Sequence, residues 1–385
     1  MSAPRRPRPI LPVARPRLPP ARDILPYLRK IDLAAWYSNH GPLARALQSR
    51  LAGYWGLPDG AVTLLSNATA ALTLTLIASG ARPGSRCLMP SWTFIASAGA
   101  VHAAGLVPHF VDVRPDTWAP DPAEVQALAE RYDVGAILVV SPFGAPLDTQ
   151  AWDKVQEATG LPVIIDAAAA FDTLRDGGPM TVGTCATVVS LHATKVFGVG
   201  EGGALLSRDP ALLERVRRLA QFGFLGTREA TTPGINAKLS EYAAAVGLAG
   251  LDSWADTRTR WSITTGCYVP RLRLVPGVKL SPGFGNRFVS STATILWPTH
   301  HTAPLPALAA HGIASLRWWG DGCHAQPAYA HCPAEPLPVT EQLAARAVGL
   351  PFWQDLTPMQ IDSVCIALLE AADPATARRR AMAAA

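Results

Sequence analysis

The sequence has few charged residues for its length. Only 16% of its 385 residues are Asp, Glu, Lys or Arg, whereas 49% are hydrophobic. The net charge is +5, and most of it comes from arginines near the start of the chain: Arg5, Arg6, Arg8, Arg15, Arg17 and Arg22. The rest of the chain is close to neutral, which argues against a disordered protein and against nucleic acid as a partner. The composition is typical of a globular protein with a sizeable core.

Paired cysteines and metal-ligand clusters are also absent from the sequence. Six cysteines are scattered with no C-x-x-C pair and no His/Cys grouping of metal spacing: Cys87, Cys185, Cys267, Cys323, Cys332 and Cys365. They are typical of free thiols in a reducing compartment, and we expect no metal site. There is no apolar run of about 18 residues and no charged-then-apolar leader. We therefore expect a cytoplasmic protein with no membrane partner.

Strand-like and helix-like stretches alternate through the middle of the chain. The pattern predicts strands at residues 86–89, 107–113, 136–140, 162–166, 186–190 and 203–207, mostly separated by helices at 95–104, 122–131 and 149–158. This alternation is typical of an α/β domain with a mostly parallel sheet flanked by helices. We predict three parts: a Pro/Arg-rich arm at 1–22, extended or disordered, a large α/β domain at 23–255, and a smaller α+β C-terminal domain at 256–385.

Further helices are predicted on either side of this alternation. Residues 24–55 read as helical except at the turn 38–42, which is either a helix stop or part of an active-site rim. Helices are expected at 211–222 and at 242–251, and the small residues of the second allow close contact within a subunit or across a dimer. The C-terminal part is expected to hold a strand at 292–297 and helices at 307–312, 340–348 and 357–371.

A single lysine, Lys195, stands between the predicted strand 186–190 and a glycine-rich turn. A lysine that is removed from water has a lowered pKa and can attack a carbonyl as the free amine, forming a Schiff base. The alternative is a lysine that only binds carbonyl groups at a strand end. Gly198, Gly200 and Gly203 match the G-x-G-x-x-G spacing of dinucleotide sites, but a strand-like run follows them where a helix is required.

Two other positions have the properties of a ligand site. Ala68 and Thr69 follow a short strand and a capping residue, Ser66 or Asn67, so their free amides are predicted to face outward at a helix N-terminus, where phosphate is stabilised. Asp166 ends the most hydrophobic strand, and ligands of parallel sheets bind at the carboxyl ends of strands. A structural alternative for Asp166 is a cap for a helix in the following alanine run.

Seven blocks of residues, taken together and in order, resemble one family. They are residues 67–72, 90–97, 111–113, 166–171, 190–195, 200–203 and 234–236. The chain resembles the DegT/DnrJ/EryC1/StrS aminotransferases, the nucleotide-sugar aminotransferases of the fold-type I pyridoxal-phosphate architecture. The resemblance runs from about Leu18 to the last helix.

The resemblance implies roles in binding pyridoxal 5′-phosphate (PLP). Lys195 matches the lysine that forms a Schiff base with the cofactor and moves the proton during transfer. Asp166 matches the carboxylate that pairs with the pyridine nitrogen, and Phe94 matches the aromatic residue stacked on the ring. One departure is Ala169, where many relatives carry Gln or His in contact with the ring, so that contact is left to another group.

The resemblance also implies a phosphate cup and a shared site. The cup is matched by Ala68, Thr69 and Ser190. Asn236 matches a residue that reaches the phosphate from the partner subunit, so a homodimer with shared active sites is expected. His324 lies in a later block that agrees with the family and is a candidate substrate residue.

The activity that the resemblance implies is amino transfer from an amino acid, with L-glutamate expected, to a keto-deoxysugar carried on a nucleoside diphosphate. A related keto-sugar dehydratase is one alternative, but such relatives replace the lysine, commonly with histidine. A non-catalytic regulatory homologue is the other. Neither alternative requires the pair Lys195 and Asp166 together.

Overall fold

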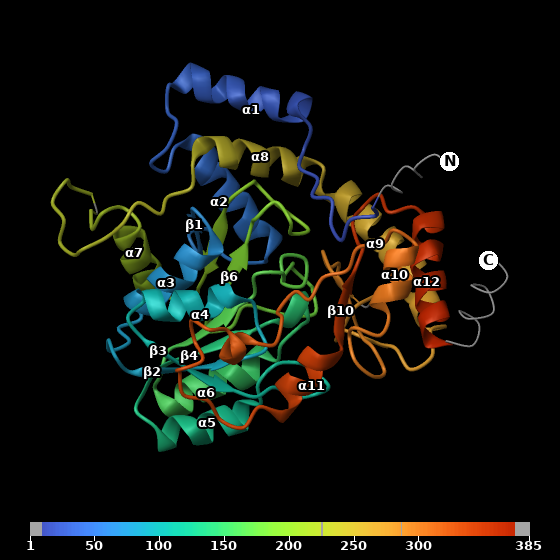
Figure 1. Cartoon of the computed structure of the whole chain (residues 1–385). Helices are drawn as coiled ribbons and strands as arrows, with labels where there is room; N and C mark the ends of the chain where they lie inside the picture. The colour runs from blue at the N-terminus through green and yellow to red at the C-terminus, as the bar shows by residue number, and fades with distance from the viewer. Residues whose placement is uncertain (1–9, 225, 286, 374–385) are drawn as a thin grey trace, which may run out of the picture.

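A seven-stranded sheet forms the centre of the larger part of the protein (Figure 1). The computed structural model describes residues 10–224, 226–285 and 287–373. The strands follow the order β1-β7-β6-β5-β4-β2-β3, in which β7 runs antiparallel to both neighbours and all other pairs are parallel. Their bounds are β1 (Val62–Leu65), β2 (Arg86–Pro90), β3 (Val107–Val111), β4 (Val134–Val140), β5 (Val163–Asp166), β6 (Ala186–Ser190) and β7 (Gly203–Leu206). The predicted mostly parallel α/β sheet is confirmed.

Helices cover both faces of this sheet, so its strands are apolar on both sides. Successive side chains of a strand point to opposite faces of the sheet. Ile164 therefore packs into the hydrophobic cluster under one helical layer, and Ile165 packs into the cluster under the other. The first layer holds α3 (Ala68–Ala78), α4 (Ile95–Ala103) and α7 (Pro210–Leu219), and the second holds α5 (Pro122–Arg131) and α6 (Thr149–Thr159).

Three further helices stack beyond the β1 edge: α1 (Ala21–Ala34), α2 (Pro42–Tyr54) and α8 (Glu241–Asp252) (Figure 1). The buried Glu241 carboxylate accepts the backbone N–H groups of Leu43 (2.7 Å) and Ala44 (2.9 Å), which are free at the N-terminus of α2. The small residues of α8 serve contacts within the chain, because a Cβ on Gly247 would lie 2.7 Å from the Leu47 side chain.

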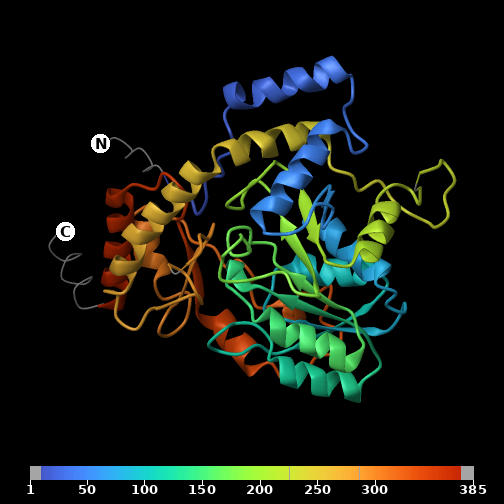
Figure 2. The same cartoon turned by 180° about the vertical axis from the view of Figure 1, so that it is seen from behind.

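A second, three-stranded antiparallel sheet lies beyond the C-terminal end of α8 (Figure 2). It has the order β10-β9-β8, with β8 (Lys279–Leu280), β9 (Ala293–Leu296) and β10 (Ala347–Leu350). The accompanying helices are α9 (Trp254–Leu272), α10 (Leu305–Ala310), α11 (Pro338–Arg346) and α12 (Pro358–Ala372). Since α9 leads from α8 to this sheet, we propose that the two domains divide near its start, close to the predicted 255/256 boundary.

Three predicted helices end two or more residues too late, and one of them is the helix expected over 307–312, which ends at Ala310. The helix expected over 340–348 is wrong at its end, because Ala347–Leu350 pair with β9 as β10. A short apolar run can adopt either state, and pairing with a neighbouring strand decides it. The helix expected over 211–222 ends at Leu219, since Phe222 has a φ of 60°, which a helix does not allow.

The predicted arm 1–22 contains no helix over residues 10–20, but its last two residues, Ala21 and Arg22, belong to α1, so the predicted boundary is two residues too late. Residues 1–9 lie outside the described residues. The turn at 38–42 separates α1 from α2 with Gly41 and Pro42 at the start of α2, which supports the helix-stop interpretation. No helix in the described part of the chain has the length and apolarity needed to cross a membrane.

Candidate active site

Lys195 lies in a tightly hydrogen-bonded loop between β6 and β7. Leu191 N–H donates to Gly202 O (2.9 Å), and Ala193 N–H donates to Gly200 O (2.8 Å), so the two arms of the loop pair with one another. Gly200 has a φ of 95°, which a residue with a side chain rarely adopts. Gly203 then begins β7 rather than a helix, so rejection of the dinucleotide interpretation is confirmed.

The surroundings of Lys195 favour the neutral form of its side-chain amine. Burial lowers the pKa of Lys195 below that of an ordinary lysine, and the nearby negative charge of Asp166 offsets part of this effect. A larger fraction of neutral amine is therefore present at neutral pH than for a lysine in water. Such an amine can act as a nucleophile toward a carbonyl or as a base.

Asp166 is a buried carboxylate at the carboxyl end of β5, with 6% of its surface exposed. Its Oδ2 accepts the hydroxyl of Ser97 (2.7 Å), and its Oδ1 accepts the N–H of Ala168 (3.1 Å). Burial raises the pKa of Asp166, while these two hydrogen bonds and the Lys195 charge act in the opposite direction. No helix follows it, since residues 167–174 form turns, so the helix-cap interpretation is wrong.

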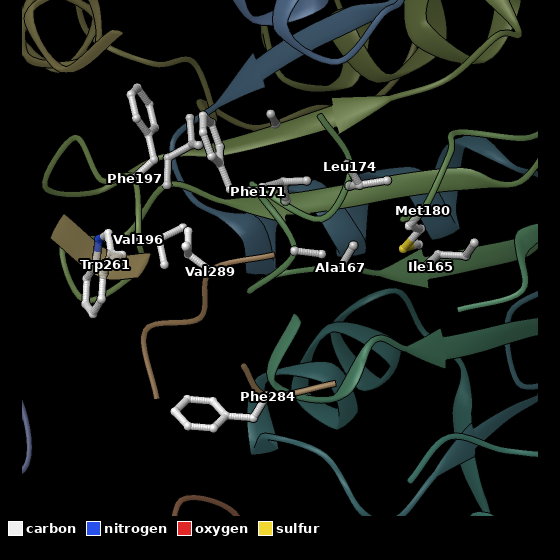
Figure 3. Packing of buried hydrophobic residues seen from close by; sticks show 14 of the residues in the cluster. Ile165, Ala167, Phe171, Leu174, Met180, Val196, Phe197, Trp261, Phe284 and Val289 are labelled. Atoms are coloured by element: carbon white, nitrogen blue, oxygen red, sulfur yellow. The ribbon is translucent and has the colours of Figure 1, made fainter. Parts of the chain in front are cut away.

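The segments that follow these two residues are locked together by aromatic packing (Figure 3). Phe171 and Phe197 stack with ring centroids 4.4 Å apart and planes 6° apart, and Trp254 packs edge-on against both rings. Val196, directly after Lys195, also points into the buried cluster in this view. Since core side chains of this size are tightly packed, the backbones that carry the lysine and the aspartate cannot shift independently.

Lys195 and Asp166 lie in one cavity of about 340 Å³. Its lining includes Asn67, Ala68 and Thr69 at the N-terminus of α3, where the Asn67 side chain accepts the N–H of Ala70 (2.8 Å) and is the helix cap. Gly203 is needed beside it, because a Cβ there would lie 2.6 Å from the backbone nitrogen of Ala68. The dipole and free amides of a helix N-terminus favour an anion at this position.

Two further predicted site residues, Ser190 and Phe94, line the same cavity, and so does Ala169. Ser190 is buried at the end of β6, and Ala169 follows Asp166 with no polar side chain to offer. Phe94 stands at the start of α4 with 55% of its surface exposed, an unusual exposure for a large aromatic side chain that lines a cavity. The structure therefore brings together Lys195, Asp166, Phe94, Ala68, Thr69 and Ser190.

Asn236 and His324 do not line this cavity within their own chain. Asn236 is exposed on the segment before α8 and accepts a hydrogen bond from Lys238 Nζ (2.7 Å). His324 lies in the short helix η2 (Cys323–Ala325), where its Nδ1 is 2.7 Å from the Ser91 hydroxyl. The roles proposed for both residues stay predictions.

The structure adds lining residues that the sequence interpretation missed. His192 Nδ1 accepts the N–H of Thr194 (3.2 Å), and its Nε2 lies 3.5 Å from Glu201. His192 and Glu201 are both close to Lys195 in the sequence, and this closeness was the signal that could have identified them as site residues. Ala14, Trp318 and Trp319 come from the arm and the smaller domain, where no motif marked them.

The residues present fit the PLP that the resemblance implies. A buried carboxylate whose hydrogen bonds leave it room for one more donor suits a pyridine nitrogen, and the exposed face of Phe94 suits a ring. The α3 N-terminus with Ser190 suits a phosphate group, and a lysine of lowered pKa lines the same cavity. A bound PLP would supply an electron-accepting ring at this place.

Comparison with known proteins agrees with this arrangement. The chain is 33% identical over 380 residues to protein Rv3402c of Mycobacterium tuberculosis, covering 94% of this chain and 90% of that protein. It is 30% identical over 357 residues to a dTDP-4-amino-4,6-dideoxy-D-glucose transaminase of Escherichia coli, covering 90% of this chain and 94% of that protein.

Among solved structures, DesI with its TDP-sugar product is similar at a TM-score of 0.83 and 31% identity, covering 97% of this chain and 96% of that chain. This likeness confirms the predicted architecture, that of fold-type I PLP-dependent aminotransferases. Residues 21–369 match the DegT/DnrJ/EryC1/StrS aminotransferase family, and the chain belongs to that family.

Proposed function

We propose that the protein uses PLP to transfer an amino group from an amino acid to a keto-deoxysugar carried on a nucleoside diphosphate. The observation that carries this proposal is Lys195, an amine of lowered pKa that shares one cavity with the buried carboxylate of Asp166. The names of the similar transaminase and of the DesI complex support a thymidine diphosphate sugar as the acceptor. L-glutamate is the proposed donor.

Within this reaction each residue of the chain has a distinct task. Lys195 holds the cofactor and, when released, accepts and returns the proton of the reacting carbon. Asp166 keeps a proton on the pyridine nitrogen, and Ser97 fixes its carboxylate through the 2.7 Å hydrogen bond. The start of α3 binds the phosphate, and Phe94 covers one face of the ring.

The distribution of charge supports a site shared between two subunits. Among the described residues that line the cavity, Lys195 is the only lysine or arginine, whereas Asp166 and Glu201 are acidic. A donor carboxylate and a diphosphate both need cationic partners. Asn236 and its neighbour Lys238 are not used by the cavity of their own chain, and we propose that they reach the cavity of a second copy.

The intact lysine favours transfer over the two alternatives. A dehydratase of this family would lack it, and a purely regulatory protein would gain nothing from an amine and a carboxylate held at a cost in desolvation. The difference between an aminotransferase and a dehydratase is visible in the product, since only the first adds nitrogen to the sugar.

The test is a product screen with the purified protein. It is incubated with PLP, L-glutamate and a set of keto-sugar nucleotides, and mass spectrometry is used to detect replacement of the keto oxygen by an amino group. We expect one or more thymidine diphosphate sugars to be converted and no conversion by Lys195→Ala. Loss of water from the sugar without gain of nitrogen would instead identify a dehydratase.

A further inference from the structure

The extended arm before α1 is bound to the smaller domain by backbone hydrogen bonds. Leu11 N–H donates to Gly312 O (2.7 Å), and Leu11 O accepts the N–H of Ala314 (2.9 Å). Two residues later, Val13 O accepts the N–H of Phe352 (2.9 Å). We call the segment 11–17 the strap, because it crosses from the smaller domain toward α1, which packs on α8 of the larger domain (Figure 1).

Side chains anchor the strap at its far end. The Arg15 guanidinium lies 5.9 Å from the centre of the Trp353 ring, within the range of a cation–π contact. Arg17 forms an ion pair with Asp355, which is 338 residues away in the sequence. Arginines that looked like a charged tail in the sequence are therefore attachments to the segment after β10.

Between these anchors, Ala14 lines the cavity of Lys195. In an extended segment successive side chains point to opposite sides. Of the strap residues, only Ala14 is among the lining residues of the cavity, while its neighbour Arg15 is exposed and turned to Trp353. The strap thus presents one small methyl group to the cavity and uses its other groups for attachment.

The same region of the smaller domain supplies two tryptophans to the cavity. Leu316 pairs with Gly349 of β10 through two backbone hydrogen bonds (3.0 and 2.8 Å), which fixes the loop that carries Trp318 and Trp319. The Trp319 ring stacks on Phe143 at 4.1 Å with planes 9° apart, so its orientation is set by the larger domain. Backbone hydrogen bonds hold both the strap and the loop with the tryptophans near β10 of the smaller sheet. The strap is bound at Phe352 and the loop at Gly349.

We propose that Ala14, Trp318 and Trp319 form the wall that receives the sugar ring, and that Ala14 is the residue of this wall that determines which sugars fit. The proposal rests on the proposed function and adds the place of the sugar within the cavity. The residues that suit the cofactor lie on the larger domain, which leaves this wall for the second substrate. Indole rings pack well on the C–H face of a sugar, and a methyl group at position 14 leaves space beside them.

The test separates binding of the sugar from binding of the nucleotide. The PLP-loaded protein is titrated calorimetrically with dTDP-glucose and with dTDP alone, comparing the wild type with Ala14→Leu. We expect the wild type to bind dTDP-glucose more tightly than dTDP. Because an extra branched side chain overfills a fitted pocket, Ala14→Leu should lose about tenfold or more in affinity for dTDP-glucose and keep its affinity for dTDP.

Two controls keep the result specific to the wall. Ala34→Leu makes the same change on the exposed surface of α1 and should bind both compounds as the wild type does. Arg17→Asp should weaken dTDP-glucose binding by releasing the strap, and the exchanged pair Arg17→Asp with Asp355→Arg should restore it. Rescue by the exchanged pair is not expected if Arg17 only contributes general positive charge.

The outcomes separate this proposal from the proposed function. If Ala14→Leu binds dTDP-glucose as tightly as the wild type, or loses dTDP and dTDP-glucose equally, the sugar does not lie at this wall and the proposal is overturned. If the wild type converts no keto-sugar nucleotide in the product screen, it is the proposed function that fails.

Discussion

Replacing Asp166 by asparagine should separate the chemical role of its charge from its role in the fold. The amide has the shape of the carboxylate, and its oxygen can still accept the Ala168 N–H (3.1 Å). The Ser97 hydroxyl, now 2.7 Å from the carboxylate, can turn and accept from the new NH₂ group. The substitution therefore keeps both local hydrogen bonds and removes only the negative charge.

The expected loss of activity follows from the strength of a charged hydrogen bond. A hydrogen bond to a charged group contributes roughly 1.5–3 kcal/mol, and each ~1.4 kcal/mol is a factor of ten in rate. If Asp166 holds the proton on the pyridine nitrogen, Asp166→Asn should slow amino transfer by about 100-fold. The assay is the rate of the half-reaction with L-glutamate, measured from the change in cofactor absorbance.

The same substitution should not lower the stability of the folded protein, even though it slows the reaction. Burial raises the pKa of Asp166, so the folded protein binds the proton more readily than the unfolded chain and the charged form costs stability at neutral pH. Wild-type protein without cofactor should gain stability as the pH falls from 7 toward about 4, the ordinary aspartate value. Asp166→Asn should lack this gain and melt no lower than the wild type at pH 7. A variant that loses tenfold or less in rate would refute the assigned role, and one that melts much lower would refute the hydrogen-bond argument.

Three further predictions concern the lysine, the assembly and the helix stack. Borohydride treatment of the PLP-loaded protein should attach the cofactor to Lys195, as read by peptide mass spectrometry, and a label on another lysine would contradict its role. Lys195→Ala and Asn236→Asp chains, each poorly active alone, should regain activity when mixed. One site of the mixed dimer then combines an intact lysine from one chain with an intact asparagine from the other. If subunit exchange is proven and activity does not rise, Asn236 lies outside the partner's site. Glu241→Ala should lower the free energy of unfolding by about 2–4 kcal/mol in urea titrations, since two buried amides of α2 lose a charged acceptor, whereas the exposed Glu214→Ala should change it by less than about 0.5 kcal/mol.

The central sheet could be predicted from the sequence because burial on both faces leaves a strong local signal. Strands such as β4 and β5 are continuous apolar runs bounded by turns. Asp166 is the last residue of β5, and Lys195 lies in the loop that follows β6. Parallel strands bring their carboxyl ends to one edge, so proximity of these two residues followed from the strand pattern.

Features that depend on contacts between distant segments could not be predicted in this way. Ala347 and Val348 continue an apolar helical pattern, and only pairing with β9 makes them a strand. Asp166 precedes four alanines that favour a helix, yet its carboxylate holds a turn through Ala168. Ala14 and Trp318 enter the site because the arm and the last strand happen to meet there, which no local pattern records.

The strap has a consequence for the order in which the protein matures on the ribosome. Chains emerge from their N-terminus, and domains fold as they become available. Leu11 and Val13 are made well before their hydrogen-bond partners Gly312 and Phe352, which follow 301 and 339 residues later in the chain. The strap must therefore wait, without these native contacts, until the smaller domain has been synthesised. A nascent or truncated chain that stops before Gly312 can therefore contain Lys195 and still lack the backbone partners that hold Ala14 against the cavity.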